Sequence, residues 1–125
     1  MSANIRAFNL TDALATFSEH WSPRIVGELN GQHVKIAKLL GEFVWHHHKH
    51  EDELFLVLKG ELVIELKPPH DTLTLREGDC VIIPRGVEHR PISRTECHIL
   101  LFEPISTLNT GNIRNERTVT EPERL

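Results

Sequence analysis

Short apolar runs, separated by turn residues, follow one another from residue 24 to residue 104. In ELVIELK, residues 61–67, apolar and polar residues alternate, which is the pattern of a strand with one buried face. RIVGEL and HVKIAKLL flank Asn30-Gly31, a strong hairpin signal because both residues tolerate positive φ. The whole pattern predicts about eight to ten short strands and little helix, which is typical of an all-β sandwich or barrel.

The length of 125 residues indicates a single domain with one core. We expect an N-terminal segment, a barrel and a C-terminal tail over residues 1–22, 23–104 and 105–125. The N-terminal segment is predicted to contain a short helix that is capped by Thr11 or Asp12, ends at Pro23, and has one apolar side made by Leu10, Leu14, Phe17 and Trp21. The tail is polar, and two interpretations stay open: it wraps the barrel, or it is partly disordered.

Charge and hydropathy exclude several classes of partner. The net charge is −4, and the 14 Lys and Arg residues are scattered, so we expect no nucleic-acid partner. No apolar run approaches the roughly 20 residues that cross a bilayer, so we expect no membrane partner. MSANIRAFNL lacks an apolar signal core, which favours a cytoplasmic protein. Cys80 and Cys97 are then expected to be small buried residues; a redox pair is the less favoured interpretation, because there is no CxxC spacing.

The run ELFLVLK, residues 53–59, is apolar on both sides. Phe55 and Val57 belong to one face of this predicted strand, and Leu54, Leu56 and Leu58 belong to the other. The second apolar face needs cover from the N-terminal segment or from another subunit. We therefore expect a homodimer.

Four histidines and three acidic residues fall between His46 and Glu53. If FVWHHH is a strand and KHED a turn, His46 and His48 share one face, about 7 Å apart along the strand, where two imidazoles can bind one metal ion. Glu53 then opens the returning strand beside them. His89 follows the turn PRG at the end of another strand. The competing interpretation is a solvated, histidine-rich loop, since each of these residues alone is most often a surface residue.

Spacing across two separate segments favours the metal interpretation. In GDCVIIPRGVEHRPIS, the residues Gly78, Pro84, Gly86 and His89 have the spacing of the second motif of the cupin family, which this chain resembles. GEFVWHHHKHEDELFLVLKG resembles the first cupin motif through His46, His48, Glu53 and Gly60. Two positions depart from the family pattern: four residues rather than five separate Gly41 from His46, and Ser93 stands where the motif has Asn.

The resemblance implies a cupin-type double-stranded β-helix, a jelly-roll barrel with a short N-terminal helix and a polar C-terminal tail. It also implies that His46, His48, Glu53 and His89 bind a metal ion, with His50 as an alternative ligand. Three imidazoles and a carboxylate suit Fe, Mn, Ni, Cu, Co or Zn, and binding should weaken below about pH 6.5. We expect Phe43 and Trp45 on the face opposite His46, and an apolar interior lined by Phe55, Val57, Ile82, Ile99 and Leu101.

Three functional hypotheses follow from the resemblance. The first is an enzyme that acts on a small organic molecule as an oxygenase or isomerase. The second is a non-catalytic, metal-dependent module that binds or senses a small ligand. The third is a barrel in which the metal is incidental. The family hosts many chemistries, so the sequence leaves both the substrate and the presence of turnover open.

Overall fold

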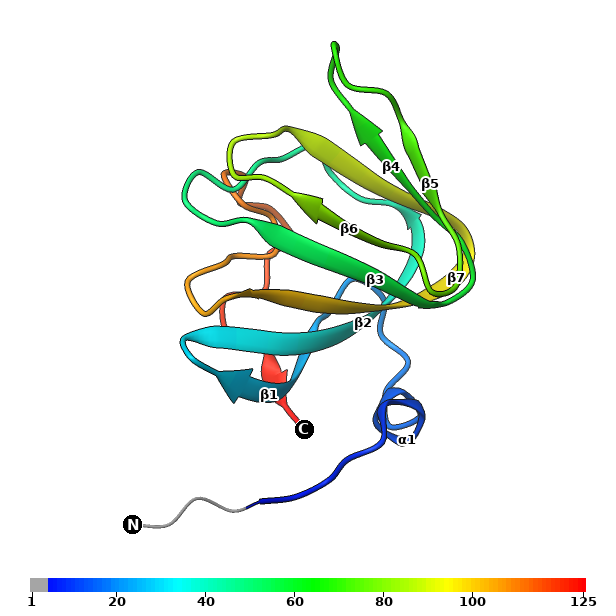
Figure 1. Ribbon diagram of the computed structural model, residues 1–125, viewed down its shortest axis with the longest axis vertical. Helices are drawn as coiled ribbons and strands as arrows, with labels where there is room; N and C mark the ends of the chain where they lie inside the picture. Colours follow the sequence, from blue (N-terminus) through cyan, green and yellow to red (C-terminus); the bar gives the residue numbers. More distant parts are fainter. Residues whose placement is uncertain (1–4) are drawn as a thin grey trace.

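The computed structural model describes residues 5–125, so residues 1–4 of the predicted N-terminal segment lie outside the described residues. One short helix and eight strands occur in this range, in agreement with the all-β prediction (Figure 1). In chain order the elements are α1 Leu10–Leu14, β1 Arg24–Leu29, β2 Gln32–Glu42, β3 Glu53–Lys59, β4 Leu62–Leu66, β5 Leu73–Leu75, β6 Cys80–Ile83, β7 His89–Pro104 and β8 Glu123–Arg124.

The long strand β7 organises the sheet. It pairs antiparallel with β2, β3 and β4, and the sheet order is β5-β4-β7-β2-β1-β8, with β3 joining β6 to β7. Figure 1 shows β7 bending through the body, so that β4 and β5 diverge from the layer of β2 and β3. A strand that pairs with three others while it bends curls the sheet around a single interior.

The predicted hairpin is confirmed. Leu29 pairs with Gln32 across the turn, and Asn30 and Gly31 have φ values of 48° and 77°. Both central residues therefore adopt the left-handed conformation that a two-residue hairpin turn requires. This turn fixes the register in which β2 presents alternate side chains to the interior.

The core lies between the inward faces of β2, β3, β4 and β7. Alternate residues of each strand are buried, as period-two alternation demands; among them are Ala37, Leu39, Phe55, Val57, Leu62, Ile64, Ile99 and Leu101. The prediction for Ile82 was wrong, because its side chain is 59% exposed while that of Ile83 is 3% exposed. Ile82 pairs with Leu54 and so lies on the outer face of the sheet.

The N-terminal helix is shorter than predicted. It ends at Leu14, and its N-cap is Asn9, whose side chain accepts a hydrogen bond from the Asp12 backbone. Neither Thr11 nor Asp12 is the cap. Trp21 has a φ of 57°, which no right-handed helix allows, and its indole Nε1 donates to the Leu40 carbonyl at 2.8 Å. Contact with β2 therefore overrides the weak helical pattern of this segment.

The two cysteines have different environments, which corrects the prediction that both are buried. Cys97 is buried in β7, whereas Cys80 is exposed at the start of β6. Cys80 pairs with Leu56, which places it on the same outer face as Ile82. Both cysteines are free thiols, and the structure forms no disulfide between them.

The C-terminal tail packs against the barrel. β8 pairs in parallel with β1, Arg24 opposite Glu123, and Figure 1 shows the chain end beside β1. Thr107 and Thr110 are buried. No helix among residues 5–125 is both long and apolar enough to cross a membrane.

Candidate metal centre

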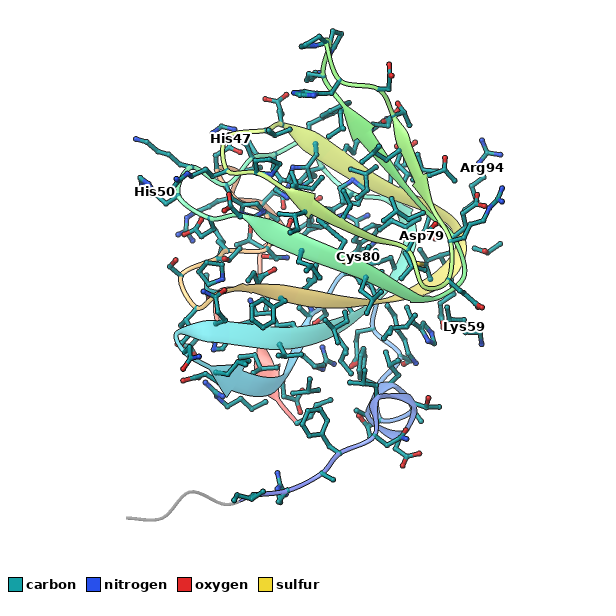
Figure 2. The ribbon with its side chains drawn as sticks, in the orientation of Figure 1. His47, His50, Lys59, Asp79, Cys80 and Arg94 are labelled. Atoms are coloured by element: carbon teal, nitrogen blue, oxygen red, sulfur yellow. The ribbon has the colours of Figure 1, made fainter. Side chains whose placement is uncertain are left out.

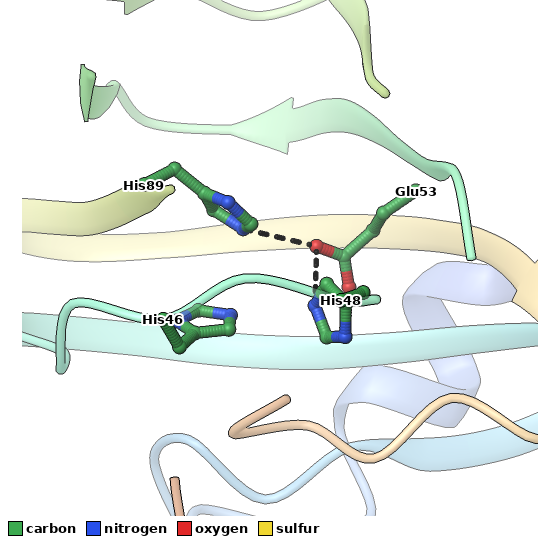
Figure 3. A group of neighbouring side chains, drawn as sticks. All are labelled: His46, His48, Glu53 and His89. Carbon is green, nitrogen blue, oxygen red and sulfur yellow. Dashed lines mark ion pairs between the residues drawn. The ribbon is translucent and has the colours of Figure 1, made fainter. Parts of the chain in front are cut away.

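Four buried side chains converge at one end of the barrel interior (Figure 3). His46, His48, Glu53 and His89 each offer a ligand atom, and these atoms all lie within 4.8 Å of one another. Each residue is at most 4% exposed. The structure thus brings together all four residues that were predicted from the sequence to bind a metal ion. It excludes His50 from the group, because that side chain is exposed and projects outward (Figure 2).

The backbone that carries the histidines is not the regular strand that FVWHHH predicted. The β2–β7 ladder has a register shift between Leu39 and Gly41 and ends where Glu42 meets Ile92. Beyond it, His46 forms an isolated bridge with His89. Their backbones exchange two hydrogen bonds, of 3.0 and 2.9 Å. This bridge joins the two histidine segments and still leaves His46 and His48 on the same side.

Two imidazoles are oriented by backbone carbonyls. Nδ1 of His46 lies 2.9 Å from the Val44 oxygen, and Nδ1 of His89 lies 2.9 Å from the Val87 oxygen. A carbonyl oxygen only accepts, so each Nδ1 carries the proton and donates it. In a neutral ring that carries its proton on Nδ1, the Nε2 lone pair is available to a metal ion. Such outer hydrogen bonds are usual for metal-binding histidines.

The charge state of the cluster also suits a cation. Burial would raise the pKa of the Glu53 carboxyl, but the imidazoles of His48 and His89 beside it hold that pKa well below its usual range. The Oε1 atom of Glu53 lies 3.4 and 3.3 Å from the Nε2 atoms of those histidines. Burial, together with the neighbouring His89 imidazole, lowers the pKa of His46 to about 4. At neutral pH the cluster therefore contains a carboxylate and at least one neutral imidazole.

Several of these candidate ligand atoms make no hydrogen bond. Both ring nitrogens of His48, Nε2 of His89 and Oε1 of Glu53 are buried without a hydrogen bond among residues 5–125. Buried polar atoms of this kind cost about 1–3 kcal/mol each when they stay unpaired. Ligands on opposite sides of one transition-metal ion stand about 4.2 Å apart, so the observed cluster accepts an ion after a small contraction. The residues present fit a divalent metal.

A cavity adjoins the cluster. Its walls are mainly apolar, and its polar lining residues are His46, Glu53, Glu103 and Asn109. Phe43 belongs to this lining and meets the His46 ring edge-on at 5.4 Å. The prediction that Phe43 lies on the face opposite His46 was therefore wrong, because the segment is not a regular strand.

Two charged residues of the interior were missed by the sequence reasoning. Lys35 and Glu103 are each 2% exposed, and Nζ of Lys35 donates to Oε2 of Glu103 at 3.0 Å. Burial and the nearby Glu53 carboxyl raise the pKa of Glu103. A signal was present in the sequence: Lys35 has the same parity as Ala37 and Leu39, so a charge occupies an inward position of a strand.

Comparison with known proteins gives consistent matches. The family described as cupin domain matches residues 33–103. The uncharacterized protein YdbB of Bacillus subtilis (strain 168) is 45% identical over 65 residues, which are 52% of this chain and 57% of that protein. The match thus spans little more than half the length of that relative.

Solved structures extend the likeness over most of the chain. A cupin-2 domain containing protein from Shewanella frigidimarina has a TM-score of 0.75 and 42% identity, and the match covers 78% of this chain and 93% of that one. Hydroquinone 1,2-dioxygenase from Sphingomonas sp. TTNP3 has a TM-score of 0.74 and 24% identity, over 83% of this chain and 33% of that one. The jelly-roll barrel predicted from the sequence is confirmed.

Proposed function

The chain belongs to the cupin family, and on that premise we propose that it is a metal-dependent protein. In this proposal His46, His48, Glu53 and His89 hold one divalent transition-metal ion. A small organic molecule reacts beside the ion, and the reaction is an oxygenation or an isomerisation. One observation carries the proposal: four buried donor atoms, most of them without another partner, converge beside a cavity with apolar walls.

The donor set supports a catalytic rather than a purely structural ion. Four protein ligands leave part of the coordination shell of a six-coordinate ion open, and open positions are typical of catalytic sites. An ion bound there supplies Lewis acidity and, when it is redox-active, electron transfer. The chain's own residues orient the imidazoles through Val44 and Val87 and exclude bulk water, since every member of the cluster is buried.

Elemental analysis tests the metal assignment. Untagged protein, purified without chelator and then stripped and dialysed against Fe²⁺, Mn²⁺, Co²⁺, Ni²⁺, Cu²⁺ or Zn²⁺, should retain about one ion per chain of at least one of these metals. Retention below about a tenth of an ion for every metal would refute the assignment. With the retained metal, turnover of a small-molecule panel identifies an enzyme. Saturable binding without turnover identifies a binding module.

The pH dependence of metal affinity follows from the pKa of His46. A histidine that is protonated in the free protein adds one to the slope of log affinity against pH. The lowered pKa of about 4 keeps His46 neutral between pH 5 and 7, so protons compete for it only as the pH falls towards 4. We therefore expect a slope of at most two, although the site has three imidazoles. Chelator competition at pH 5, 6 and 7 measures it, and a slope of three would contradict the expectation.

We also propose a homodimer formed through the outer apolar face, defined by Leu54, Leu56, Cys80, Ile82, Leu100 and Phe102. Leu54 pairs with Ile82 and Phe102, and Leu56 pairs with Cys80 and Leu100, so these side chains form two adjacent rows. None is charged, and Cys80 and Ile82 are exposed. A neutral face of this kind is self-complementary about a two-fold axis.

Light scattering on a sizing column tests the dimer. We expect a mass of twice 14.3 kDa for the wild type and of one chain for Ile82→Asp, because the new carboxylate would be buried without a partner. Ile105→Asp changes another exposed isoleucine, 45% exposed and outside the outer apolar face, and should remain dimeric. A monomeric wild type, or a dimeric Ile82→Asp, would refute this interface.

The cytoplasm is the compartment that we propose. Both cysteines are free, and the Cys80 thiol is exposed. An exposed thiol persists most readily in a reducing compartment.

A further inference from the structure

The cavity beside the metal centre combines apolar walls with a few polar groups at one side. Its apolar lining comes from β2, β3 and β7 and from Trp21 and Phe43, whose rings stack at 4.7 Å. Such a lining favours a molecule that is mostly hydrocarbon. The polar groups of the cavity then decide which functional group the molecule carries, and at which end.

Glu103 is the polar group whose presence the metal centre does not explain. Its side chain lines the cavity and lies beside the Glu53 carboxyl, but it is not among the four converging residues. Lys35 occupies one oxygen, Oε2. The other oxygen, Oε1, is buried and has no hydrogen-bonding partner within residues 5–125. The protein thus holds a carboxyl group in place through one oxygen, and beside the second oxygen lie the Glu53 carboxyl and an apolar space, with no donor group bonded to it.

We propose that the cavity takes a small, largely apolar molecule that bears a hydroxyl group, and that Oε1 of Glu103 hydrogen bonds this hydroxyl. The inference rests on the proposed function, because it names the class of molecule that meets the metal. Glu103 is a residue that determines specificity in this arrangement. Lys35 acts through it as a positioning residue, since it fixes the orientation of the carboxyl group.

The charges around the cavity favour a hydroxyl over other polar groups. A carboxylate on the ligand would enter next to Glu53 and Glu103, which are both acidic. An ammonium group would lie near a divalent cation and be desolvated among apolar walls, at a large cost. A hydroxyl is neutral, and it both donates and accepts a hydrogen bond. It therefore pairs with the carboxyl group of Glu103 whether or not that group carries a proton.

A pair of matched probes tests the inference. Phenol and toluene have similar size and shape but differ in the hydroxyl group. We expect the Zn²⁺-loaded wild type to bind phenol at least about tenfold more tightly than toluene, as one hydrogen bond to the Glu103 carboxyl group allows. Calorimetry or ligand-observed NMR on both the Zn²⁺-loaded and the metal-stripped protein measures the ratio of the two affinities.

The double variant Lys35→Met/Glu103→Leu removes the Glu103 carboxyl group together with its Lys35 partner, so that no unpaired charge remains. Apolar replacement of a whole buried ion pair is often tolerated, so the barrel should fold and keep its metal, because neither residue is a proposed ligand. We expect the phenol-to-toluene ratio to fall to about one. The single variant Glu103→Gln preserves shape and a polar oxygen, and should keep part of the preference.

The outcomes separate this inference from the proposed function. Metal content reports on the proposed function, and the ratio of affinities reports on Glu103. Wild-type protein that binds no phenol at about 10 mM, or binds phenol and toluene equally, would overturn the inference even when the metal is present. A double variant that retains the full preference would overturn it as well. A variant that loses zinc would show that the buried pair supports the metal centre, and would overturn the assignment of Glu103 to the ligand alone.

Discussion

Replacing His89 with alanine is expected to lower the metal content from about one ion per chain to below about a tenth, while the barrel stays folded. His89 is fully buried, and its Nε2 atom is directed at Glu53. Loss of one ligand from a four-residue set removes much of the binding free energy, because three donors no longer surround the ion. The backbone bonds between residues 89 and 46 do not depend on the side chain, so they survive in the variant.

His47→Ala is the matched control for this variant. His47 precedes His48 in the chain, yet its side chain lies at the periphery (Figure 2), and its recorded hydrogen bonds to Asn112 are made by the backbone. We expect full metal content in this variant. Elemental analysis of the two untagged proteins, with circular dichroism to verify folding, decides the matter. Equal metal in both variants would show that the histidine cluster is not the binding site.

Gly111→Ala is expected to lower the free energy of unfolding by roughly 2–4 kcal/mol, a large effect for one methyl group. A Cβ atom at this position would stand 2.2 Å from the His47 carbonyl oxygen and 3.1 Å from the His46 ring. The His47 backbone cannot move aside as the end of a flexible side chain can. The C-terminal tail would therefore have to shift away from the segment that carries His46 and His47. The φ of 56° adds a further cost for alanine. Denaturant unfolding measures the change.

Gly78→Ala separates the steric effect from the conformational one. Gly78 also has a positive φ, of 87°, but a Cβ there would meet nothing within 4 Å. This control should lose only the backbone component, roughly 1 kcal/mol. Similar losses in the two variants would show that the tail does not press on the histidine segment. A lower metal affinity in Gly111→Ala alone would show that the tail supports the position of His46.

The convergence of His46, His48, Glu53 and His89 could be predicted from the sequence because these residues lie in two segments of fixed spacing. His46 and His48 needed only period-two parity to share a side, and His89 needed only the turn at Pro84 and Gly86. His46 and His48 lie on the same side, as the alternation of a strand predicts, although the segment is not a strand. The single bridge between His46 and His89 is enough to align it. The prediction for Phe43 was wrong because this segment is irregular. The β2–β7 ladder ends at Glu42, just before Phe43, so regular strand alternation no longer sets the orientation of that side chain.

The Lys35–Glu103 pair illustrates what a linear pattern leaves out. Each residue belongs to a different strand, and 68 positions separate them in the chain. Nothing local specifies that β2 and β7 become neighbours, because that pairing is a property of the closed sheet. Trp21 was misplaced for a similar reason: its bond to the Leu40 carbonyl is a tertiary contact, and local helical propensity is too weak to compete with it.

The pairing of β7 with three strands also bears on the order of events during synthesis. Most neighbours in this barrel are distant in the chain, and the last strand pairs with the first, Arg24 opposite Glu123. Such topologies fold slowly, since large loops close before any contact compensates for them. When the segment with His46 and His48 has just been synthesised, β7, which aligns that segment through His89, has not yet been made. Under the proposed function, the ion therefore binds only after β7 has been synthesised, and the earlier nascent chain gains no stability from it.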